Sequence, residues 1–152
     1  MLPHIRKKLR TKLLNIVFLI GILSVVNAQD NVDKNEIVGF ACFFGGKPSK
    51  TVEKYTQKLN SKNYKWISKQ LESENKAEQY MSVITLEKLT ELRKYKLSET
   101  ELNLIAEIKK STKLVSVCSG CTYFQKVELK NMFTKEMLPM ANDWLNYNFK
   151  KE

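Results

Sequence analysis

Hydrophobic residues recur at helical spacing through the middle of the chain. Positions 52, 55 and 59 are apolar, and so are positions 64, 67 and 71. Intervals of three and four residues place each set on one face of a helix. The turn-forming run NSKN at 60–63 separates the two stripes. The pattern therefore predicts a helical hairpin over roughly 49–59 and 63–72.

The next helix, predicted over about 76–94, is apolar on nearly every face. Its apolar residues are Ala77, Tyr80, Met81, Val83, Ile84, Leu86, Leu89 and Leu92. A helix of this kind is normally buried on most faces, so we expect it at the centre of the core. Asn75 and Glu78 have the spacing of a capping box at its start.

A stronger capping signal begins the following helix. Ser98 and Glu101 have the spacing of a capping box, and Leu97 and Leu102 occupy the positions of a hydrophobic staple. The apolar pattern then continues to about Lys110. These signals predict a helix over 98–110.

Three other segments complete the pattern. Residues 37–46, IVGFACFFGG, form an apolar run short enough to be either a buried strand or a short buried helix. Residues 113–127 are rich in Val, Thr, Tyr and Phe around a Ser-Gly turn, which predicts a two-stranded hairpin or an extended loop. A last helix is predicted around 142–149.

These elements predict a mainly all-α fold, with an α+β fold as the alternative. The two successive helical hairpins, 49–72 and 76–110, resemble the helix-pair stack of HEAT and armadillo proteins over about 60 residues. The resemblance implies that the hairpins pack side by side. The extended or hairpin segment near 113–127 and the C-terminal helix would complete the domain.

The N-terminal residues have the pattern of an export signal. Residues 1–12 carry five basic side chains and no acid, and residues 13–26 are almost continuously apolar. Short side chains precede a cut between Ala28 and Gln29, as in a secretory signal peptide. We expect residues 1–28 to be removed, leaving a flexible leader at 29–36 and a single helical domain over 37–152. The mature protein is then secreted or periplasmic, with no stable membrane span.

Charge argues against a nucleic-acid partner. The net charge of +10 falls to +5 after the expected cut, and 20 of the 21 remaining basic residues are lysines. Specific recognition of bases relies on the bidentate contacts of arginine, and only Arg93 remains. The lysines are also scattered among glutamates, which is typical of a solvated surface.

The absence of histidine from the expected mature chain excludes most catalytic mechanisms. The only histidine, His4, lies in the expected signal peptide. The mature chain then lacks the usual general base near neutral pH and every Cys/His zinc arrangement. We therefore expect no catalytic residues, no cofactor and no metal site, and we interpret the glutamates at 72, 74 and 78 as favourable charges near a helix start.

Three cysteines and one tryptophan are the candidate functional residues. Cys118 and Cys121 form a CSGC motif, which is the spacing of a thiol–disulfide or metal–thiolate site. Export would place them, with Cys42, where disulfides persist. We expect a structural bridge from Cys42 to the CSGC turn, with Cys118–Cys121 as the alternative. Trp66 lies one position off its helical stripe, which indicates a partly exposed contact residue.

Three functions fit these features. The favoured one is a non-catalytic protein-binding module whose partner is another extracytoplasmic protein. The first alternative is a thiol–disulfide or metal–thiolate protein that uses the CSGC motif. The second is a small-ligand carrier with a pocket beneath the apolar segment at 37–46.

Overall fold

The computed structural model describes residues 35–42, 45–120 and 123–150. Residue contacts divide the chain into Met1–Val32 and Asp33–Glu152, and every described element belongs to the second unit. The elements are β1 (Ile37–Val38), α2 (Lys50–Asn60), α3 (Tyr64–Lys69), the 3-10 turn η1 (Gln70–Glu72), α4 (Lys76–Glu91), α5 (Glu99–Ile108), β2 (Leu114–Ser119), β3 (Tyr123–Glu128), the 3-10 turn η2 (Leu129–Phe133) and α6 (Leu138–Phe149). The expected signal peptide with its cut at Ala28 and Gln29, most of the expected leader, and Cys121 lie outside the described residues.

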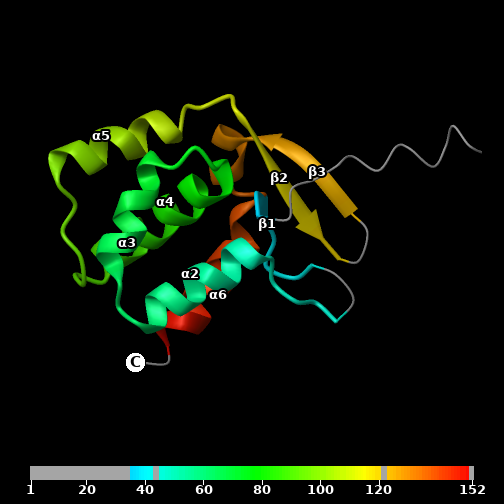
Figure 1. Cartoon of the computed structure of the whole chain (residues 1–152), viewed down its shortest axis with the longest axis horizontal. Coiled ribbons are helices and arrows are strands. Elements are labelled where there is room, and N and C mark those ends of the chain that lie inside the picture. The colour runs from blue at the N-terminus through cyan, green and yellow to red at the C-terminus, as the bar shows by residue number, and fades with distance from the viewer. Residues whose placement is uncertain (1–34, 43–44, 121–122, 151–152) are drawn as a thin grey trace, which may run out of the picture. The chain divides into compact units, whose positions relative to one another are not determined.

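The fold is rich in helices and contains a small sheet in the order β1-β2-β3. Strands β2 and β3 form an antiparallel hairpin in which Cys118 lies opposite Phe124. The short strand β1 runs parallel to β2, with Ile37 opposite Ser116. Figure 1 shows the sheet to one side of the helices. This architecture agrees with the expected mainly helical fold and also with the α+β alternative.

The predicted helical hairpin at 49–72 is confirmed as α2 followed by α3. The Ser49 hydroxyl accepts a hydrogen bond from the Val52 amide at the start of α2, and the Asn63 side chain caps α3 in the same way. Between the helices Lys62 adopts a left-handed φ of 53°. The Lys62 amide donates a hydrogen bond to the Leu59 carbonyl, and the Asn63 amide donates one to the carbonyl of residue 58. This pair of hydrogen bonds is the Schellman termination of a helix. Local signals are therefore sufficient to define this hairpin.

Helix α4 is the centre of the core, as predicted. Every residue from 81 to 86 is buried, and α4 contacts α2, α3, α5 and α6 as well as both β1 and β2. The helix ends at Glu91 and not at the predicted residue 94. The reason is a second Schellman motif, in which Arg93 adopts a φ of 57° and the Lys94 amide bonds to the Leu89 carbonyl.

The capping box of α5 is present. The Ser98 hydroxyl accepts a hydrogen bond from the Glu101 amide, and the Glu101 carboxylate accepts one from the Ser98 amide at 2.7 Å. The structure does not support the expected hydrophobic staple between Leu97 and Leu102 as clearly as it supports the capping box. Leu97 packs against the core, whereas Leu102 is 52% exposed.

The expected capping box at the start of α4 is only half formed. Asn75 accepts hydrogen bonds from the amides of Ala77 and Glu78. The Glu78 carboxylate does not reach back to Asn75, because it binds the Ser73 hydroxyl at 2.6 Å and the Lys54 ammonium at 2.8 Å. The prediction of a full box was wrong, because the nearby Ser73 and the distant Lys54 bind the carboxylate, and the Asn75 amide donates to the Ser73 hydroxyl at 3.1 Å instead.

Glu101 also links α5 to the rest of the fold. Its carboxylate accepts hydrogen bonds from the hydroxyls of Ser68 and Tyr95, in addition to those from Ser98. Partial burial raises the pKa of Glu101, but these hydrogen bonds favour the charged form more strongly and hold the pKa at about 2. A folded-state pKa below the ordinary 4.5 means that ionised Glu101 stabilises the fold.

We expect Glu101→Gln to destabilise the protein at neutral pH and to lose this effect in acid. The stabilisation from a carboxylate with a depressed pKa is fully present above pH 4.5 and is lost as the pH falls towards about 2. Urea unfolding of the wild type and the variant across this range measures the difference. Glu99→Gln, in the same helical turn, is the matched control. A difference between wild type and Glu101→Gln that is independent of pH would contradict the role of the ionised group.

The C-terminal and N-terminal segments depart from expectation in detail. Helix α6 begins at Leu138, four residues before the predicted start, and Pro139 occupies its first turn. Proline is tolerated there because first-turn amides have no partner within the helix. Residues 37–46 contribute a strand, but only its two residues Ile37–Val38 pair with β2. The turn η2 was not predicted.

Candidate functional site

The structure joins Cys42 and Cys118 by a disulfide, which is one of the two pairings that the expected bridge from Cys42 to the CSGC turn allowed. Their Cα atoms lie 5.7 Å apart, within the usual range for a bridge. Both residues are buried, with Cys42 fully inaccessible and Cys118 3% exposed. The bridge is compatible with an oxidising, extracytoplasmic location.

Backbone contacts surround this bridge on several sides. The Cys42 amide donates to the Lys47 carbonyl at 2.7 Å, and the Gly120 amide donates to the Ala41 carbonyl at 3.0 Å. A Cβ atom at Gly39 would overlap both sulfur atoms, so this position accepts only glycine. A thiolate must reach a sulfur atom to exchange with a disulfide, and the burial of both cysteines disfavours such an approach.

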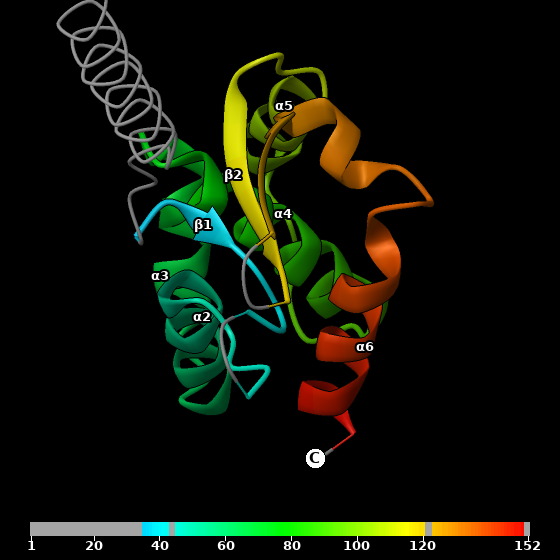
Figure 2. The ribbon, with the colours of Figure 1, turned by 90° about the vertical axis from the view of Figure 1, so that its right-hand side faces the viewer.

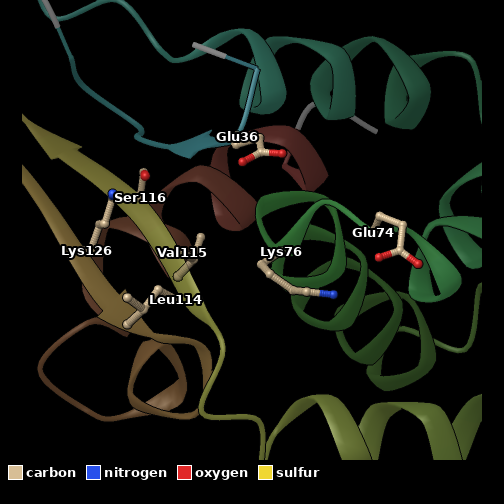
Figure 3. Close-up of a pocket in the computed structure, with 7 residues that line it drawn as sticks. All are labelled: Glu36, Glu74, Lys76, Leu114, Val115, Ser116 and Lys126. Atoms are coloured by element: carbon tan, nitrogen blue, oxygen red, sulfur yellow. The ribbon is translucent and has the colours of Figure 1, made fainter. Parts of the chain in front are cut away.

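A polar pocket lies beside the start of β1 and encloses about 250 Å³. It is lined by Glu36, Glu74, Lys76, Leu114, Val115, Ser116 and Lys126. Figure 3 shows Lys76 and Glu74 on the helical side and Ser116 and Lys126 on the sheet side, with Glu36 between them. The pocket exists because β1 pairs only with positions 116 and 117 of β2. The first two residues of β2 consequently have no neighbour in β1.

Leu114 is one of the residues that line this pocket. The Lys113 carbonyl accepts a hydrogen bond from the Leu129 amide, on the β3 side of β2. Backbone groups of successive strand residues point to opposite sides, so the amide and carbonyl of Leu114 point towards the β1 side. The strand β1 begins too late to pair with them.

Charges of both signs face the same space. Within the described part of the chain, Glu36, Glu74, Lys76 and Lys126 form no ion pair and no side-chain hydrogen bond. Burial lowers the pKa of Lys76, and the nearby Lys113 ammonium lowers it further, whereas Glu74 and Glu36 raise it. The pocket can therefore bind anionic and cationic groups together.

A second hollow lies between α4 and α6, which run beside each other in Figure 2. This groove has a volume of about 410 Å³ and is lined by Ile84, Glu87, Lys88, Glu91, Leu138, Asn142, Leu145 and Asn146. Ile84 and Leu145 belong to the core and form its apolar floor. The acidic groups on its rim are paired, Glu87 with Lys109 at 2.5 Å and Glu91 with Lys88 at 2.8 Å.

Two asparagines on α6 present open amides to this groove. Asn142 and Asn146 are exposed, and their side chains form no hydrogen bond with any described residue. Residues four apart on a helix are separated by about 6 Å along its axis. Alternate residues of an extended peptide repeat at about 6.6–6.8 Å. The axial separation of the two asparagines is therefore close to this repeat.

Trp66 is half-buried, but neither hollow includes it. Its ring packs edge-on against Tyr55 with centroids 5.3 Å apart. The ammonium groups of Lys54 and Lys58 lie 4.7 and 5.3 Å from the ring centroid, in the range of cation–π interactions. The ring is thus engaged by neighbours within the fold.

Sequence reasoning did not identify the two hollows, although it expected Ile84 to belong to the core. Glu74 was interpreted as a charge near a helix start, and Lys76 and Lys126 resembled other surface lysines. The one available signal was the repeat of asparagine at positions 142 and 146 on the predicted last helix.

Within the described ranges, no three His, Cys, Asp or Glu side chains cluster closely enough to hold a metal ion. No helix among the same residues is long and apolar enough to cross a membrane. Comparison with family models, curated proteins and solved structures finds no match to this chain. Function is therefore inferred from the geometry of the two hollows.

Proposed function

We propose that the chain is an exported, non-catalytic protein-binding module. In this proposal the groove between α4 and α6 holds an extended segment of another extracytoplasmic protein. The observation that carries the proposal is the pair of open amides at Asn142 and Asn146 above an apolar floor. Each amide offers a donor and an acceptor, which matches the N–H and C=O groups of a peptide backbone.

The chemistry of the groove defines the segment that fits. Ile84 and Leu145 offer an apolar surface to one or more side chains of the partner. The ion pairs of Glu87 and Glu91 leave the rim without a strong excess of either charge. An apolar side chain carried on an extended backbone is the best match to this combination.

Export and domain organisation belong to the same proposal. The basic and apolar N-terminal pattern supports a secreted or periplasmic location, and the buried Cys42–Cys118 bridge is compatible with it. The helical hairpins would stack as pairs in the manner of HEAT and armadillo proteins. Contacts of α4 with both α2 and α3 support such a stack.

The thiol–disulfide alternative is disfavoured by the burial of Cys42 and Cys118. Catalytic exchange requires an accessible sulfur and a reactive thiolate. The small-ligand alternative is favoured by a separate observation, the polar pocket beside β1.

Selection from a displayed library of random linear peptides tests the proposed function. Peptides that bind the mature protein are titrated against the variant Asn142→Ala/Asn146→Ala. We expect the variant to bind about tenfold more weakly, because each lost hydrogen bond contributes about 0.5–1.5 kcal/mol and 1.4 kcal/mol is tenfold in affinity.

Asn103→Ala is the matched control for this experiment, because Asn103 is an exposed asparagine on α5 that does not line the groove. Thermal unfolding of all three proteins shows whether the fold is kept. Equal affinity for the double variant and the control would exclude the groove as the binding site.

A further inference from the structure

We propose that the polar pocket of Figure 3 is a second binding site, for a small zwitterion with an aliphatic side chain. Free apolar amino acids and short apolar dipeptides are the chemical class. The proposal is independent of the groove, because the two hollows share no lining residue.

The size and polarity of the pocket limit its ligand. Its volume of about 250 Å³ lies below the range of roughly 300–1,000 Å³ that is usual for drug-sized ligands. Such sites are also mostly apolar, whereas four charged side chains line this one. A small and strongly polar ligand is therefore indicated.

The charges require a ligand that carries both signs. The carboxylates of Glu36 and Glu74 would repel a simple anion, and the ammonium groups of Lys76 and Lys126 would repel a simple cation. A zwitterion places its carboxylate near the lysines and its ammonium group near the glutamates. Each of these side chains is available, because none has an ion-pair partner within the described residues.

Strand β2 supplies the remaining contacts. The amide and carbonyl of Leu114 point towards the β1 side of β2, at a level where β1 has not yet begun. The polar groups of an amino acid can bind there as one additional residue of the sheet, a minimal case of strand addition. The Leu114 side chain is 56% exposed and lines the same pocket, so it offers apolar surface to an aliphatic side chain.

Titration of the ¹⁵N-labelled mature protein with free leucine tests the proposal by NMR. We expect shifts of the amide resonances of Lys76, Leu114 and Ser116, with a dissociation constant of about 1 mM or tighter. N-acetyl-leucine lacks the ammonium group, leucinamide lacks the carboxylate and glycine lacks the side chain. Each is expected to bind at least tenfold more weakly. A parallel titration with leucyl-glycine distinguishes a dipeptide site from an amino-acid site.

Two variants test which charged side chain of the pocket binds which charged group of leucine. Lys76→Gln should weaken leucine binding at least tenfold and leave leucinamide binding unchanged. Glu36→Gln should weaken leucine binding but leave N-acetyl-leucine binding unchanged. Lys65→Gln is the control, because Lys65 is an exposed lysine on α3 outside the pocket. Equal affinity for leucine and N-acetyl-leucine would show a plain anion site and overturn the proposal. The proposal would also be overturned if the folded protein showed no shift of the pocket amide resonances when leucine is added.

Discussion

Removing the Cys42–Cys118 bridge is expected to lower the free energy of unfolding by about 4.5 kcal/mol, the loop-entropy value for a bridge of this span. The two cysteines are 76 residues apart in sequence, so the bridge removes many conformations from the unfolded chain. Urea unfolding of Cys42→Ala/Cys118→Ala measures the change. Cys121→Ser is introduced into both proteins so that no other bridge can form.

Two observations control this experiment. Chemical reduction of the bridged Cys121→Ser protein should lower its stability by a similar amount, because it removes the same restraint. Peptide mapping without reduction should yield a fragment that links residues 42 and 118. A double variant as stable as its parent, or a mapped link between 118 and 121 in the wild type, would contradict the structural role of the bridge.

Leu86→Ala is expected to cost about 2–5 kcal/mol, the range for a large-to-small change in a core. Leu86 is fully buried in α4, the helix that contacts most other elements. Its replacement removes apolar contacts and leaves a cavity that the surrounding helices fill only in part. Midpoints of urea unfolding, with an unchanged slope, measure the loss.

Leu102→Ala makes the same chemical change at a site that is 52% exposed. Substitutions at the surface usually change stability by less than about 0.5 kcal/mol, so this variant sets the baseline. If Leu86→Ala were as mild as Leu102→Ala, α4 would not be the centre of the core.

The helices were largely predictable because their signals are local. Ser98 and Glu101 lie within one turn of each other, and their mutual hydrogen bonds require no other part of the chain. The apolar residues around α4 also predicted its burial from sequence spacing alone. At Glu78 the spacing rule failed, because the neighbouring Ser73 and the distant Lys54 compete for the groups of the expected box.

The polar pocket could not be predicted, because its walls come from separate segments. Glu36 and Lys126 are brought together only when β2 pairs with β1 on one side and with β3 on the other, and the packing of α4 against β2 adds Lys76. No periodicity marks such residues, since exposed charges follow no hydrophobic pattern. The length of β1 is equally non-local, because the pairing of Ile37–Val38 with β2 defines it.

The sequence by itself determined which segments become helices, which helix lies in the core, and which three cysteines could pair. Short-range hydrogen bonds and hydrophobic spacing are sufficient for those features. Only the tertiary structure decided that Cys42 pairs with Cys118, because the parallel pairing of β1 with β2 brings residues 37–42 against residues 116–120. The same pairing begins only at Ser116, which leaves the pocket open beside Leu114. Contacts between residues far apart in the chain depend on the whole packing, which no local pattern encodes.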